Sequence, residues 1–156
     1  MYPYILAFIL AVFPPRGPWG LHQREAVARD IASTDASPLE ALTLANIAAW
    51  ESGFDTKAKG RQGERGAFQV MPPGDPGARS ALRLLRLQGI LGYMGCPRRT
   101  ERCEAMADRR TFPAKLWLWS HDPPAPAPEV DSVAVMAPDV DASRGCFSPD
   151  SLPDPD

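Results

Sequence analysis

The sequence of 156 residues is poor in the side chains that bind metals or act as nucleophiles, with two histidines and three cysteines. His22 and His121 lie far along the chain from the closely spaced Cys96 and Cys103, and no Cys-x-x-Cys pair occurs. This pattern excludes the usual zinc sites, and the same shortage of partners excludes a thiol protease. The sequence therefore predicts no metal and no cofactor.

The three cysteines leave two alternatives for their redox state. Cys96 and Cys103 are seven residues apart, close enough to close a small loop, which would fit an oxidising compartment. Cys146 would then stay unpaired. The alternative is three free thiols.

The sequence also lacks any run that alternates like a β-strand, and it has no internal repeat. Helical patterns, most with a proline or a capping residue near the start, cover residues 21–32, 38–52, 76–91, 101–110 and 113–120. The prediction is a mainly α fold, with one compact domain over residues 19–120. Residues 121–156, rich in proline and acids, are predicted to form a disordered acidic tail.

Long apolar runs are missing as well, since the longest, residues 4–13, has ten residues and is too short to span a bilayer. Its length suits the core of a signal peptide, but no basic residue precedes it and no small-x-small cleavage site follows it. Residues 1–18 are therefore predicted to be an apolar N-terminal segment that is either signal-like, a packing segment or an interfacial anchor. Secretion is the preferred alternative.

A capping box marks the start of the helix that carries the main candidate residue. Ser37 and Glu40 bracket a proline at the first helical position, and Gly53 supplies a residue that commonly ends a helix. Glu51 then lies in the last turn of a largely apolar helix. Free carbonyls and an apolar surround both favour the protonated carboxyl that a general acid needs. The alternative is a carboxylate that points into water or pairs with a nearby Lys57 or Arg65.

A second segment, residues 66–72 (Gly-Ala-Phe-Gln-Val-Met-Pro), places one amide in an apolar strip. Gln69 lies between Phe68 and Val70, and its side chain could donate to and accept from a sugar hydroxyl or acetamide. The alternative is an amide at the edge of the core that backbone groups satisfy.

Together the Glu-Ser-Gly-Phe sequence at residues 51–54 and the segment at residues 66–72 resemble the lytic transglycosylase family, the lysozyme-like enzymes that cleave bacterial peptidoglycan. The similarity is clear over about residues 41–72. It implies a compact lysozyme-like helical domain.

The resemblance also implies roles for single residues. Glu51 would be the only catalytic acid and base, with Ser52 assisting it. Phe68 and Gln69 would line the glycan cleft.

The family usually carries an Ala-Tyr-Asn-Ala-Gly-like segment later in the domain, which this chain lacks. The nearest candidate is Gly-Tyr-Met-Gly at residues 92–95. Tyr93 could then hydrogen-bond to Glu51, or it could be a loop anchor. Of the other nearby acids, Asp55 follows the helix-ending glycine and Glu64 lies in a loop expected to be solvated, so neither is predicted to be a nucleophile.

Charge divides the chain unevenly, since residues 57–115 hold thirteen Lys and Arg against five Asp and Glu. A positive region suits an anionic polymer such as peptidoglycan, although it would attract nucleic acid equally. The alternative is a solvated basic helix face formed by Arg79, Arg83 and Arg86.

The resemblance predicts a monomeric, extracytoplasmic or phage-associated peptidoglycan lytic transglycosylase. Its partner would be glycan strands, without nucleic acid, and its setting could be wall remodelling, secretion, conjugation or phage assembly. The alternatives are a lysozyme-type muramidase and a cell-wall binding or virion structural module without turnover.

Overall fold

The computed structural model describes residues 1–96 and 100–125. Within these residues the chain forms five α-helices and no β-strand, with only isolated bridges between Arg65 and the residues Lys59 and Val70. The helices are α1 (Tyr2–Val12), α2 (Gly17–Ala32), α3 (Pro38–Ser52), α4 (Ala78–Tyr93) and α5 (Glu101–Ser120). The predicted mainly α fold is confirmed. Most of the predicted acidic tail, from residue 126 on, lies outside the described residues.

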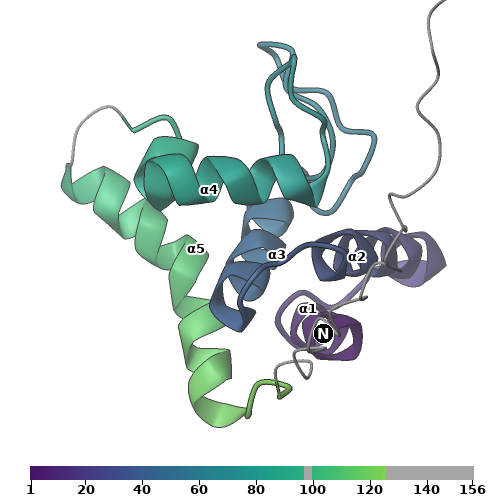
Figure 1. Cartoon of the computed structure of the whole chain (residues 1–156). Coiled ribbons are helices and arrows are strands. Elements are labelled where there is room, and N and C mark those ends of the chain that lie inside the picture. The colour runs from purple at the N-terminus through teal and green to yellow at the C-terminus, as the bar shows by residue number, and fades with distance from the viewer. Residues whose placement is uncertain (97–99, 126–156) are drawn as a thin grey trace, which may run out of the picture. The chain divides into compact units, whose positions relative to one another are not determined.

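Helix α3 is the central element, and the other four helices pack on it (Figure 1). The Ser37 hydroxyl accepts a hydrogen bond from the Glu40 backbone N–H while the Glu40 carboxylate accepts one from the Ser37 N–H, so the predicted capping box is present. All eight residues from 41 to 48 are buried, and Gly53 ends the helix in the left-handed conformation at φ 64°. The bounds of α3 agree with the prediction.

The N-terminal apolar run forms α1 and packs into the same core. Ile5, Phe8 and Ile9 are fully buried, and the Phe8 ring contacts the rings of Phe13 and Trp117 edge to face. In this structure the run is thus a packing segment of the helical domain. Among the described helices, none is long and apolar enough to cross a membrane.

Helix α5 differs from the prediction, because one continuous helix replaces the two that were expected over residues 101–110 and 113–120, the second beginning at Pro113. A proline inside a helix leaves the carbonyl four residues earlier without its usual donor, which normally favours a break. Here tertiary packing holds the helix together, since Ala114 is fully buried and the Asn46 side chain donates a 2.6 Å hydrogen bond to the Arg110 carbonyl.

Helix α4 and its junction with α5 carry two further features. The helix begins at Ala78 and is interrupted at Gly89, where φ is 64° and ψ is 178°. A disulfide then joins Cys96 to Cys103 in the first turn of α5, so the paired alternative is the one the structure contains. Cys146 lies outside the described residues.

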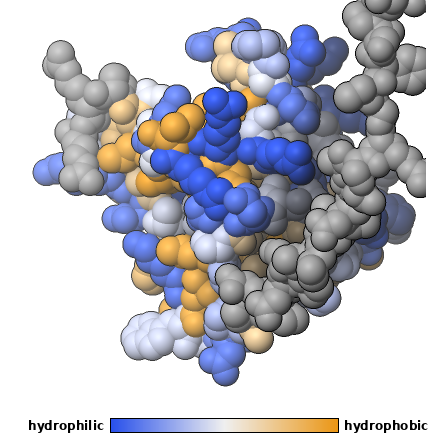
Figure 2. All heavy atoms as spheres, in the orientation of Figure 1, coloured by the Kyte–Doolittle hydropathy of each residue, from blue (hydrophilic) through white to orange (hydrophobic). Residues whose placement is uncertain are grey.

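The outer face of α4 is mostly charged. Arg79, Arg83 and Arg86 are all exposed, as the predicted solvated basic face requires. Blue hydrophilic atoms mingle with orange apolar ones over α4 and α5 (Figure 2), and the exposed apolar side chains there include Leu87 and Phe112.

Arg86 ties α4 to the start of α3. Its guanidinium donates to both carboxylate oxygens of Glu40, at 2.8 and 3.0 Å, and to the Asp35 carboxylate at 3.0 Å. These bonds from Arg86, helped by the Ser37 backbone N–H, lower the pKa of Glu40 to about 2, although partial burial acts the other way.

We expect Arg86→Gln to lower the melting temperature at pH 7, whereas Arg83→Gln on the same exposed face should leave it unchanged. The pKa of Glu40 is lower in the folded protein than its ordinary 4.5. The ion pair between Arg86 and Glu40 therefore stabilises the fold fully above pH 4.5, and this stabilisation is lost as the pH falls towards 2. The difference in melting temperature between Arg86→Gln and wild type should therefore shrink as the pH is lowered from 4.5 to 2. Melting curves by circular dichroism from pH 7 to pH 2 test this, and a constant difference would contradict it.

Candidate active site

Glu51 lies at the rim of a cleft of about 520 Å³ at the C-terminal end of α3. The cleft is formed by that helix end, by the loop over residues 53–77, by the end of α4 and by the middle of α5. Its lining residues are Glu51, Gln62, Glu64, Phe68, Gln69, Met71, Tyr93, Met94, Gly95 and Arg110. Four of the five residues predicted from sequence, Glu51, Phe68, Gln69 and Tyr93, thus line one cleft.

Ser52, the fifth predicted residue, has a different place. Its hydroxyl lies 3.2 Å from the Ala48 carbonyl oxygen and 2.9 Å from the Ala67 carbonyl oxygen, so it links the last turn of α3 to the loop that carries Phe68 and Gln69. Ser52 therefore holds a wall of the cleft in position, and its hydroxyl proton is used in that contact.

The loop reaches the cleft through unusual backbone conformations. Gln69 has a positive φ of 50°, which is uncommon outside glycine and is often found at functional sites. Its side-chain amide donates to the Gly66 carbonyl at 2.9 Å, which leaves the second amide N–H and the oxygen Oε1 for a ligand. Phe68 is 1% exposed and forms the apolar floor.

Tyr93 contacts the loop rather than Glu51. Its hydroxyl donates a 2.6 Å hydrogen bond to the Phe68 carbonyl, 25 residues away in sequence, which differs from the bond to Glu51 that the resemblance suggested. Burial, and to a lesser degree the charge of Glu51, raises the pKa of Tyr93 well above its usual value. The phenol is thus a neutral anchor of the loop at the edge of the cleft.

Arg110 is a site residue that the sequence did not reveal. Its Nη2 lies 2.9 Å from Glu51 Oε1, across 59 residues of sequence, and the two side chains are 12% and 26% exposed. The same guanidinium lies 5.8 Å from the centre of the Trp50 ring. Its Nε is buried and has no hydrogen-bond partner within the part of the chain that the structure describes. Glu51 is therefore held in an ion pair, which would have to open before Glu51 could act as an acid.

Glu64 is the second residue that the sequence analysis did not place in the site. It was expected in a solvated loop, but it lines the cleft together with Glu51. Its carboxylate accepts a hydrogen bond from the Gln62 N–H at 2.9 Å and lies over Gly60. A β-carbon at Gly60 would collide with this carboxylate and would lie 2.7 Å from Gln69 Oε1, so only glycine lets both groups lie there.

Among the described residues, no group of three or more His, Cys, Asp or Glu side chains is arranged to hold a metal ion. No family model, curated protein or solved structure matches the chain.

The loop depends on Gly66, which has a φ of 75° and lies against Pro76. A β-carbon at Gly66 would be 2.8 Å from the Pro76 carbonyl oxygen, whereas Gly63, with a φ of 98°, faces open space. Both alanine variants carry a backbone cost of about 1 kcal/mol at positive φ. Only Gly66→Ala adds a collision with the backbone, so we expect a clearly larger loss of unfolding free energy for it than for Gly63→Ala. Equal losses in urea titrations would contradict this packing.

The ion pair between Glu51 and Arg110 can be tested without any assay of activity. Arg110→Gln and Glu51→Gln each leave a partly buried charge unpaired, whereas the double variant leaves none. We expect a coupling of about 1 kcal/mol in urea unfolding, with the double variant more stable than the sum of the single losses implies. Arg109→Gln, at an exposed neighbouring position, is the control and should not couple to Glu51. A coupling near zero would show that the pair does not form.

Proposed function

We propose that the protein is a peptidoglycan lytic transglycosylase that acts with Glu51 as its acid and base. The observation that supports this best is the cleft itself, which gathers Glu51, Phe68, Gln69 and Tyr93 from segments up to 42 residues apart. These are the residues on which the resemblance to the family placed the catalytic and glycan-binding roles.

The reaction needs one carboxyl group and no metal. Glu51 gives its proton to the oxygen between N-acetylmuramic acid and N-acetylglucosamine while the bond from that oxygen to C1 of the muramic acid breaks. The Glu51 carboxylate then takes the proton of the C6 hydroxyl on the same muramic acid, whose oxygen bonds to C1. The product is a 1,6-anhydro ring, and no water is consumed.

The surrounding residues would hold the glycan during this reaction. Gln69 Oε1 can accept a hydrogen bond from a hydroxyl or from the N–H of an acetamide, and Phe68 provides an apolar floor. Tyr93 stays neutral and fixes the Phe68 backbone. Arg110 must release Glu51 for the proton to be carried, and its guanidinium can then pair with a carboxylate of the substrate.

A protein that cleaves peptidoglycan would act outside the cytoplasm, where this polymer lies. The disulfide between Cys96 and Cys103 supports an oxidising compartment. A cell's own remodelling, a secretion or conjugation apparatus, and phage lysis or assembly would all provide this substrate.

One observation favours a second candidate, a muramidase that cleaves with water. Hydrolysis of glycosidic bonds generally uses two carboxylates, and Glu64 lines the same cleft as Glu51. In that case Glu64 would activate the water or stabilise the charge at C1. The transglycosylase reaction needs no contribution from Glu64.

We expect mass spectrometry of the products released from purified peptidoglycan to contain anhydromuramic ends with wild type. Glu51→Gln should reduce them by at least about a hundredfold, the size of a general acid–base contribution, while Glu64→Gln should keep most of the activity. Circular dichroism of each variant checks that it is folded. Reducing ends, with loss of activity in both variants, would instead establish the hydrolase, and no products from wild type would refute both candidates.

A further inference from the structure

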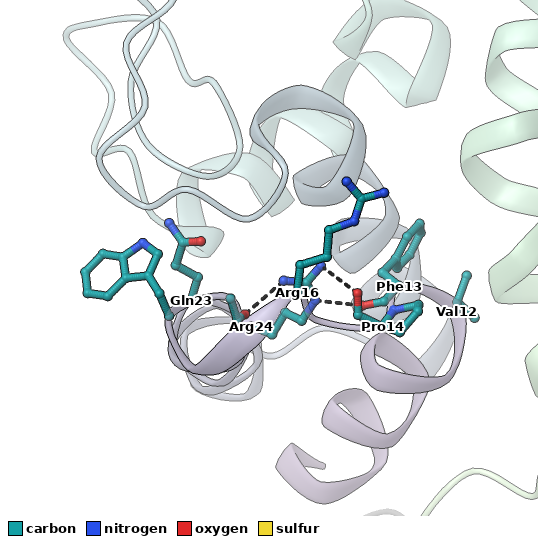
Figure 3. Close-up of a pocket in the computed structure, with 8 residues that line it drawn as sticks. Val12, Phe13, Pro14, Arg16, Gln23 and Arg24 are labelled. Atoms are coloured by element: carbon teal, nitrogen blue, oxygen red, sulfur yellow. Dashed lines mark hydrogen bonds between the residues drawn. The ribbon is translucent and has the colours of Figure 1, made fainter.

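A second hollow of about 570 Å³ lies where α1 turns into α2, and it shares no residue with the cleft at Glu51 (Figure 3). A smaller hollow of about 150 Å³ adjoins it, because Trp19 and Gln23 line both. The smaller hollow continues to Asp55 and Lys57, just beyond the end of α3. Trp19 and Gln23 therefore lie where the two hollows meet.

Trp19 is held out from the protein rather than buried. It is 68% exposed, and it lies in the first turn of α2, where Gly17 enters the helix at a φ of 83° that favours glycine. Unlike the other exposed tryptophans, Trp19 lines two hollows, so a ligand lying there would cover its ring and remove apolar surface from water. A sugar ring, which has an apolar face and polar edges, matches the apolar body and polar N–H of an indole.

Arg24 ties together the turn between α1 and α2 on the side of the hollow. Arg24 donates hydrogen bonds to the carbonyl oxygens of Phe13 at 2.6 Å and Gly20 at 2.9 Å, and its guanidinium lies 4.8 Å from the centre of the Phe54 ring. Figure 3 shows Arg24 tied in this way to the chain around it. A site that is already formed loses less entropy when a ligand binds.

Two polar side chains at the hollow are free, in contrast to Arg24. The side chains of Arg16 and Gln23 make no hydrogen bond or ion pair with another residue of the described ranges. In Figure 3 the Arg16 guanidinium extends away from the hydrogen bonds of Arg24. An amide can serve a hydroxyl or an acetamide, and a guanidinium can pair with a carboxylate. The hollow thus combines an aromatic platform, an amide and one free cation.

We propose that Trp19, Gln23 and Arg16 form a second glycan-binding site that holds a peptidoglycan strand away from the bond being cleaved. Trp19 stacks on a sugar ring, Gln23 binds a hydroxyl or acetamide, and Arg16 pairs with a carboxylate of a stem peptide. The choice of peptidoglycan as the ligand rests on the proposed function. Arg16 and, in the adjoining hollow, Lys57 are too few cations for a nucleic acid, whose binding usually depends on several contacts to phosphates.

Binding without turnover tests the site most directly. We take the full chain as Glu51→Gln and measure its sedimentation with insoluble peptidoglycan. Adding Trp19→Ala should weaken binding about tenfold, as removal of a central aromatic contact does, and Trp19→Phe should restore part of it. Trp119→Ala is the matched control, since Trp119 is 88% exposed on α5 and lines neither hollow, and it should bind like the parent.

Chitin separates the contribution of the sugar from that of the peptide, because it shares the β-1,4-linked N-acetylglucosamine backbone but has no stem peptides. Trp19→Ala should weaken binding to both polymers. Arg16→Ala should weaken binding to peptidoglycan severalfold and leave binding to chitin unchanged. Equal losses on the two polymers for Arg16→Ala would refute the pairing with a carboxylate.

The result that would overturn the site is binding by Trp19→Ala equal to that of the parent, or equal losses for Trp19→Ala and Trp119→Ala. Because Trp19 lies outside the core, an unchanged melting temperature should confirm that the variant folds. Release of products from peptidoglycan by otherwise wild-type protein provides the second readout. Cleavage that occurs without any Trp19-dependent binding would refute this site alone, whereas Trp19-dependent binding without cleavage would refute the proposed catalysis alone.

Discussion

The burial of the middle of α3 is the constraint on which the rest of the structure depends. Eight consecutive residues, from 41 to 48, are inaccessible or nearly so, and α1, α2, α4 and α5 all pack around them. A helix that is covered on every side cannot shift along its axis without opening the core. Its C-terminal turn is therefore fixed, and Glu51 is fixed with it. The Ser52 hydroxyl then ties the returning loop to this turn, so the cleft is held by the core of the domain.

Polar contacts determine where α5 meets α3. Asn46 is fully buried and donates to the Arg110 carbonyl, while the side chain of Arg110 pairs with Glu51 one turn further along α3. Both contacts would be lost if α5 moved by one turn. The arrangement is costly, because Asn46 Oδ1 and Arg110 Nε are buried without a partner within the described chain.

Short sequence motifs predicted the features that depend on residues close together in the chain. The capping residues Ser37 and Glu40, together with Gly53, predicted both ends of α3. The resemblance to a known family, and no local signal, predicted that Phe68 and Gln69 would line one cleft with Glu51. Long-range packing determined the rest. The continuity of α5 through Pro113 depends on the contact with α3 and on burial of Ala114, neither of which a propensity can express.

The two cleft residues that the sequence analysis did not predict, Arg110 and Glu64, also owe their places to the tertiary fold. Arg110 is one of many basic residues between residues 57 and 115, and only the tertiary fold distinguishes it from its exposed neighbour Arg109. Glu64 reaches the cleft because Gly60 leaves room above its backbone, which is a property of the folded loop. Tyr93 lines the cleft, but its hydroxyl donates to the Phe68 carbonyl and not to Glu51.

The proposed function requires a glycan to bind in the cleft beside Glu51. The most direct measurement is a nuclear magnetic resonance titration of ¹⁵N-labelled Glu51→Gln protein with a soluble peptidoglycan fragment of one or two disaccharide units. We expect the largest amide shifts on residues 68–71 and 93–95, the two segments that carry most of the residues lining the cleft with Glu51. Shifts confined to other surfaces, with these two segments unchanged at saturation, would contradict the proposed function.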